Sequence, residues 1–185
     1  MRSILALDVS ATATGWAYGL PGDLPISGVE RFGREGSTAD ETFVRAVVWL
    51  NGQLSVLNPA IVAMEAPILT SGGGFTNPHT ADLLQGIIHV FRFAVKARMP
   101  GRAHLIASST ARKTFTGHGR YGKGAAKPAV QAEAVRRGWL TLESMDPDKA
   151  DALAVWCHMA AQQLPELSFN QPKTKRPARV ADVEF

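Results

Sequence analysis

Cysteine is almost absent from this sequence of 185 residues, and its scarcity excludes two kinds of stabilisation. With Cys157 as the one cysteine, no internal disulfide can form, so we expect a reducing compartment and therefore the cytoplasm. One cysteine and five scattered histidines also make a poor set of ligands for a structural zinc ion.

Long apolar runs are missing as well. No stretch reaches the roughly 18 apolar residues that a membrane span requires. An acid, Asp8, comes too early for an N-terminal signal peptide. The sequence therefore predicts no membrane partner.

Acidic residues are sparse in one part of the chain. The whole sequence has a net charge of +4, a mild bias toward polyanionic partners. From Arg112 to Arg137, seven basic residues stand against one acid, Glu133. Residues 165–185 are polar and add Lys173, Lys175, Arg176 and Arg179. We expect these last residues to form a basic, loosely ordered tail behind a single domain of residues 1–164.

The hydrophobic pattern predicts an α/β fold. Strands are expected at residues 3–9, 14–18, 26–32, 60–65 and 104–107. Helices are expected at residues 38–57 (capped by Thr38 or Asp40), 80–98, 109–116 (capped by Ser109 or Thr110), 127–137 and 147–163. This order indicates a mixed five-stranded sheet flanked by helices, with its first three strands in an antiparallel meander.

The helix at residues 80–98 is apolar nearly all the way round. Such a helix is buried on two sides. One side meets the sheet, and we expect the other to meet a second subunit in a homodimer.

Four acids are placed where a site can form. Asp8 and Glu65 each end a buried strand, and Asp148 and Asp151 project from one face of a helix. Carboxylates that converge in a partly buried place need a cation, and oxygen ligands select Mg²⁺ or Mn²⁺. Two such ions can cut a phosphodiester and leave a 5′-phosphate. Two alternatives stay open: Asp148 only caps its helix, or Asp146 is the ligand in its place.

Several segments resemble one known family, the RuvC-type Holliday junction resolvases of the RNase H-like superfamily. They are the opening Asp8-Val-Ser-Ala-Thr-Ala-Thr-Gly-Trp-Ala17, the strand Ile61-Val-Ala-Met-Glu65, Leu84-Gln-Gly86, the basic segment Ala111–Val130 and the final Asp148-Lys-Ala-Asp151-Ala-Leu-Ala154. The resemblance spans roughly residues 3 to 160.

The resemblance implies an RNase H-like fold, a homodimer and symmetrical nicking of four-way DNA junctions that depends on two Mg²⁺ ions per site, with Mn²⁺ as a substitute. It makes Asp8, Glu65, Asp148 and Asp151 the metal ligands. It also makes Lys113 and Lys127 phosphate contacts near the scissile bond.

The sequence departs from this family at three places. Val9-Ser10 stands where cellular members usually have Pro-Gly, the loop at residues 117–127 is long, and no aromatic residue closely follows Glu65. These departures are similar to those of phage-borne members. They leave the cleavage sequence open, as well as the choice among Holliday, Y-shaped and flap substrates.

Further residues are candidates for DNA contacts. Lys113, Arg120, Lys123 and Lys127 can neutralise phosphates, with Tyr121 available for stacking. Phe75, in the glycine-rich loop after Glu65, can wedge into an opened junction. The alternatives are a solvated basic face and a packed phenylalanine.

Three other functions compete with junction resolution. A YqgF-type nuclease that processes ribosomal RNA would share the fold and the acids. A non-catalytic branched-DNA-binding protein would share the basic surface. A sugar-kinase or actin-like ATPase needs two such domains, for which 185 residues are too few.

Overall fold

The computed structural model describes residues 1–11, 13–33, 36–67 and 78–169, and within them five strands form one mixed sheet. The strands are β1 (Ile4–Val9), β2 (Ala13–Gly19), β3 (Ile26–Arg31), β4 (Ile61–Glu65) and β5 (Ala103–Ile106). Their order is β3-β2-β1-β4-β5; β1, β2 and β3 pair antiparallel, whereas β4 pairs parallel with both β1 and β5. The predicted sheet and its meander are confirmed.

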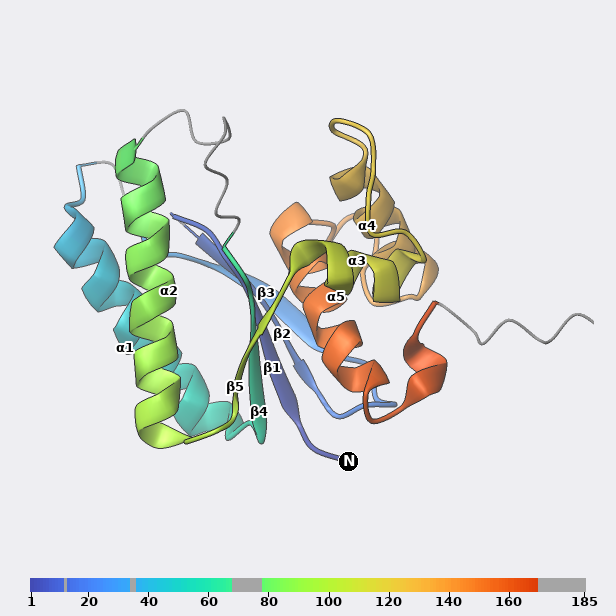
Figure 1. Cartoon of the computed structure of the whole chain (residues 1–185), viewed down its shortest axis with the longest axis horizontal. Coiled ribbons are helices and arrows are strands. Elements are labelled where there is room, and N and C mark those ends of the chain that lie inside the picture. The colour runs from blue at the N-terminus through green and yellow to red at the C-terminus, as the bar shows by residue number, and fades with distance from the viewer. Residues whose placement is uncertain (12, 34–35, 68–77, 170–185) are drawn as a thin grey trace, which may run out of the picture.

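Helices cover both faces of the sheet, with α1 and α2 on one face and α3, α4 and α5 on the other (Figure 1). Their bounds are α1 (Ala39–Leu57), α2 (Pro78–Arg98), α3 (Ser108–Thr116), α4 (Ala126–Arg136) and α5 (Pro147–Ala161). Each predicted helix is present, within a few residues of its expected ends.

The alternation of side chains along β1 divides the core into two layers. Leu5, Leu7 and Val9 are buried with α1 and α2, whereas Ile4 and Ala6 are buried with α5. Because successive side chains of a strand point to opposite faces, the residue after Leu7 belongs to the α5 face. The local sequence of β1 therefore decides on which side of the sheet its acid lies.

Capping residues account for the ends of two helices. Thr38 caps α1 in a capping box with Glu41, which settles the choice between Thr38 and Asp40. Asn58 ends the helix in the left-handed region, with φ of 42°. The cap expected for α3 is wrong: the helix begins at Ser108 after Ala107, no side chain caps it, and Ser109 and Thr110 lie inside it.

Helix α5 is buried on nearly all sides between the sheet and the helices α3 and α4. Every residue from Ala150 to Cys157 is buried, and Trp156 is among the largest side chains with no exposure. A helix so enclosed cannot shift without disturbing both layers, so it is a rigid support for any side chain at its start.

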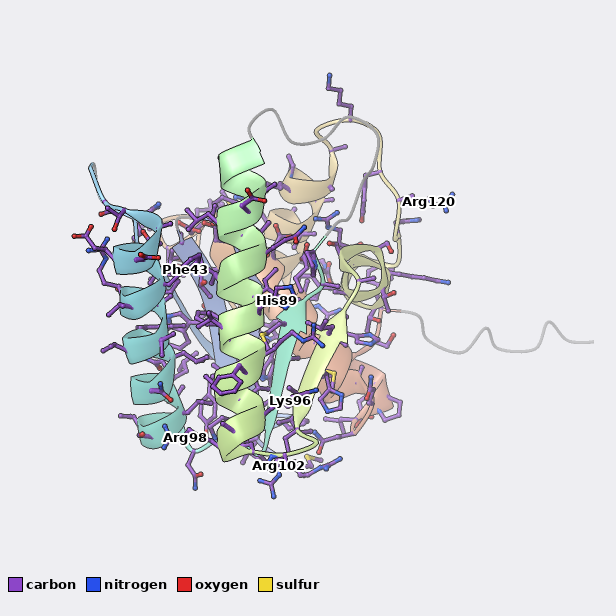
Figure 2. All side chains as sticks on the ribbon, turned by 60° about the vertical axis from the view of Figure 1, so that its left-hand side comes forward. Phe43, His89, Lys96, Arg98, Arg102 and Arg120 are labelled. Atoms are coloured by element: carbon purple, nitrogen blue, oxygen red, sulfur yellow. The ribbon has the colours of Figure 1, made fainter. Side chains whose placement is uncertain are left out.

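One side of α2 remains uncovered within the chain. Ile87, Phe91 and Val95 are fully buried against the sheet and α1, where Phe43 of α1 lies between the two helices (Figure 2). Phe93, in contrast, is 75% exposed. The homodimer expected through this helix stays a prediction.

The first residues of the expected tail pack against the domain. Pro165–Leu167 form a 3-10 helix, and the Phe169 backbone N–H donates to the Thr114 carbonyl over 2.7 Å. Residues 170–185 lie outside the described residues, so the loosely ordered tail stays a prediction for them. Among the described helices, none is both long and apolar enough to cross a membrane.

Candidate active site

Asp8 and Glu65 lie at the carboxyl ends of neighbouring parallel strands. The register of β1 and β4 pairs Leu7 with Met64, which places the two acids side by side one residue later. Alternate residues of β4, beginning with Ile61, enter the core beneath α5. Both carboxylates therefore project from the same face of the sheet, toward α5.

Gly15 allows α5 to begin against the sheet. In β2 it pairs directly with Asp8. A Cβ at this position would lie 2.0 Å from the Asp148 carbonyl oxygen. Because Gly15 has no side chain, the start of α5, which carries Asp148 and one turn later Asp151, can approach the acid on β1.

Asp146, and not Asp148, caps α5. The Asp146 carboxylate accepts hydrogen bonds from the backbone N–H groups of Asp148 over 2.8 Å and of Lys149 over 3.3 Å. Capping therefore engages Asp146, and the carboxylate of Asp148 has no capping role. The charge of Asp148 raises the pKa of Asp8 and of Asp151.

Three of the four carboxylates have a raised pKa, and the charge of Asp148 contributes to two of these shifts. Burial raises the pKa of Asp8 well above its usual range, and the charges of Glu65, Asp151 and Asp148 raise it further. Burial also raises the pKa of Glu65, with a contribution from Asp151. The pKa of Asp151 is raised by burial and then by Asp148. The structure thus brings all four predicted acids into one electrostatic cluster.

A serine and a lysine each contact one carboxylate of this cluster. The Ser108 hydroxyl donates a short hydrogen bond to Glu65 Oε1. Lys127 Nζ lies 3.8 Å from Asp148 Oδ1, with the Lys127 side chain 58% exposed. Lys127 therefore reaches the acids from the solvent side, as a predicted phosphate contact should.

Arg112 is a further site residue, which the sequence alone did not single out. Its Nε lies 4.0 Å from Asp151 Oδ1, beyond hydrogen-bond range, and is buried without a hydrogen-bond partner. Against the larger effect of burial, Arg112 lowers the pKa of both Glu65 and Asp151. The signal in the sequence was its spacing: Ser108 follows β5 at the acidic edge, and Arg112 is one helical turn later.

The candidate donors are of the chemical kind that a hard divalent cation prefers. They are carboxylate oxygens only, partly buried, and they repel one another in the way that a bound cation would relieve. Among the described residues, no three or more acidic, histidine or cysteine side chains lie close enough together to coordinate one metal ion. The acids are clustered by their strands and helix, and Arg112 and Lys127 stand beside them.

The other predicted DNA contacts do not join the acids. Lys113 and Arg120 line a separate hollow, and Lys123 is exposed on the loop after α3. The Tyr121 hydroxyl forms a short hydrogen bond with Thr116, so its ring is tied to the loop. The predicted wedge, Phe75, lies outside the described residues.

Comparison of the fold with solved structures finds RuvC-type resolvases. RuvC of T. thermophilus in complex with a Holliday junction substrate matches with a TM-score of 0.66 and 19% identity, over 91% of this chain and 98% of that chain. Thermus thermophilus RuvC in another structure matches with a TM-score of 0.65 and 17% identity, over 88% and 96%. The chain has the RNase H-like fold of RuvC.

A third similar structure comes from yeast. The yeast mitochondrial Holliday junction resolvase Ydc2 matches with a TM-score of 0.58 and 12% identity, over 88% of this chain and 80% of that chain. No family model and no curated protein matches the chain by sequence. The fold expected from the resemblance is confirmed, and its chemistry rests on the residues described above.

Proposed function

We propose that this protein is a Mg²⁺-dependent, structure-specific endonuclease that resolves Holliday junctions and related branched DNA. One observation carries the proposal: Asp8, Glu65, Asp148 and Asp151 cluster in a RuvC-like fold, with Arg112 and Lys127 beside them. A structure with that fold is described as RuvC in complex with a Holliday junction substrate, which supports branched DNA as the substrate.

The four carboxylates would hold two Mg²⁺ ions, with Mn²⁺ as a substitute. When bound, the ions supply the positive charge that favours attack of water on a phosphodiester and departure of the 3′-oxygen, which leaves a 5′-phosphate. The raised pKa values of Asp8, Glu65 and Asp151 fit this role, because a cation favours the charged carboxylates that burial disfavours.

The protein's own side chains bind and orient. Ser108 holds one oxygen of Glu65 and thereby leaves the other free to face the cluster. Lys127, exposed and only loosely paired with Asp148, can exchange that carboxylate for a phosphate of the DNA. Arg112 has a buried N–H without a hydrogen-bond partner, directed at the same cluster, and can stabilise negative charge there.

Cleavage of a substrate panel tests the proposal. With Mg²⁺, we expect the wild type to nick a synthetic four-way junction, and Asp8→Asn to bind it without nicking. Asp23→Asn, which removes an exposed acid in the β2–β3 turn, should cut at the wild-type rate. Wild-type cutting by Asp8→Asn contradicts the metal site, cleavage of structured RNA alone supports a YqgF-type nuclease, and binding without cleavage supports a non-catalytic protein.

Paired nicking requires two active sites, and we propose a homodimer through α2. Phe93 is the large exposed apolar side chain on the outer side of this helix. Phe93→Glu should give a monomer at micromolar concentration by light scattering, because a charge would replace the apolar contact. Val48→Glu on α1, also 66% exposed, is the matched control and should stay dimeric. A monomeric wild type would contradict the dimer.

A further inference from the structure

Helix α3 presents two neighbouring rows of side chains with different surroundings. Ser108 and Arg112, four residues apart, face Glu65 and Asp151. Ser109 comes directly after Ser108, and Lys113 directly after Arg112. Ser109 and Lys113 therefore project about 100° further round the helix. Within the described residues, neither Ser109 nor Lys113 forms an ion pair or side-chain hydrogen bond with a carboxylate. This second row lines a hollow of about 790 Å³ outside the acidic cluster.

The wall of this hollow is built by close packing of backbone. The loop after α3 reverses at Gly117, which has a φ of 84°, and returns across the start of the helix. A Cβ at Gly119 would lie 2.7 Å from the Ser109 carbonyl oxygen and 3.4 Å from the Cβ of Lys113. This contact fixes the loop against α3 and places the following residue, Arg120, at the hollow, where it extends away from the sheet (Figure 2).

The lining has the chemistry of a site for a nucleic-acid backbone. It comprises Ser109, Thr110, Lys113, Thr114, Gly117, His118, Gly119 and Arg120. No acid and no large apolar side chain is among them. Within the described part of the chain, neither Lys113 nor Arg120 forms an ion pair with a carboxylate. Unpaired cations beside exposed hydroxyls recognise phosphodiester oxygens, which accept from both.

We propose that this hollow holds a phosphate of the strand being cut, within about three nucleotides of the scissile phosphate. The proposal rests on the proposed nuclease function. The two rows of α3 are separated by no more than the helix diameter of roughly 10 Å, and phosphates of one strand advance about 3.4 Å per nucleotide. In this proposal Arg112 serves the cut phosphate and Lys113 a flanking one, whereas the resemblance implies that Lys113 acts near the scissile bond.

A charge-removal experiment on both partners tests the assignment. Four-way junctions would carry a single uncharged methylphosphonate at each of the three positions on either side of the cut phosphate. Binding would be measured in EDTA for the wild type and for the double variant K113Q/R120Q. The matched control is R2Q/R102Q, which removes the same charge from the opposite edge of the sheet, where β1 and β5 begin.

For the wild type, we expect one flanking methylphosphonate to weaken binding about tenfold, because it removes a charged contact. In K113Q/R120Q the same methylphosphonate should have little effect, since its protein partner is already gone. The control variant should keep the wild-type profile. Because one phosphate contact is lost, the slope of the salt dependence of binding should fall by about one unit in K113Q/R120Q.

The possible outcomes distinguish failure of the proposed phosphate site from failure of the proposed nuclease function. Equal methylphosphonate profiles for the wild type and K113Q/R120Q, with normal cutting of the unmodified junction, would overturn the hollow alone. A wild-type profile in which none of the flanking methylphosphonates weakens binding would do the same. A wild type that neither binds nor cuts the unmodified junction would contradict the proposed function and the hollow together. Both double variants should melt at the same temperature as the wild type, which would show that the substitutions leave the fold intact.

Discussion

The close approach of β2 and α5 makes Gly15→Ala the sharpest test of how the acidic cluster is built. The added Cβ would lie 2.0 Å from the Asp148 carbonyl oxygen and 2.4 Å from its carbonyl carbon. Ordinary contact begins near 3.4 Å, so the start of α5 would have to retreat by about 1.4 Å. Both clashing atoms are backbone, so no rotation of a side chain can relieve the contact.

The retreat of α5 affects both stability and cutting. Overpacking costs about 1–3 kcal/mol, and we expect the upper end of that range because α5 is buried on nearly all sides. In a domain of this size, about 3 kcal/mol lowers the melting midpoint by roughly 6–12 °C. A shift of about 1 Å in catalytic groups costs on the order of 100-fold in rate. Asp148 and Asp151 would move away from Asp8, so single-turnover cutting should fall by at least that factor.

The measurements are urea unfolding and single-turnover cleavage of a four-way junction. Gly52→Ala is the control, because a Cβ at that position of α1 has no neighbour within 4 Å. It should stabilise the protein by about 0.5–1 kcal/mol, since alanine favours a helix over glycine, and leave cutting unchanged. A Gly15→Ala protein with wild-type stability and rate would refute the packing of α5 against β2.

Two further predictions concern charge. In EDTA, the unfolding free energy of the wild type should fall as the pH rises from about 4 toward the raised pKa values of Asp8, Glu65 and Asp151, because the folded protein retains protons that the unfolded chain releases. Asp8→Asn should flatten this fall in urea unfolding at several pH values, and equal slopes would contradict it. Arg137→Met should lower the unfolding free energy by about 3 kcal/mol. The nearly buried Arg137 guanidinium donates to Glu133 and to two backbone carbonyls, and these contacts would be lost. Exposed Arg136→Ala is its control and should lose much less stability in the same assay, because solvent screens its ion pair with Glu133. Equal losses would show that the Arg137 contacts contribute little.

Short-range patterns in the sequence were sufficient for the elements and for the acids. Apolar runs ended by an acid marked β1 and β4, and Pro147 marked the start of α5. The start of α3 did not follow the local capping pattern, because the N-cap is Ala107 and no side chain caps the helix. The first helical residue, Ser108, instead donates to Glu65, a tertiary contact that no local pattern indicates.

The basic residues show the same division more clearly. Composition marked residues 112–137 as basic but did not show which of them face the acids. The direction of each side chain depends on how its helix packs against the sheet. Lys113 and Arg112 are adjacent in sequence, yet they lie on different faces of α3 and have different neighbours.

The sequence by itself determined the strand and helix order, the mixed sheet and the four acids of the candidate site, because strand periodicity and strand-end acids are local properties. Only the tertiary structure decided that Arg112 joins the acids, that Asp146 caps α5 and that Lys113 faces a separate hollow. The physical reason is that neighbours of a side chain are set by the packing of α3 and α5 on the sheet, and packing joins residues far apart in the chain.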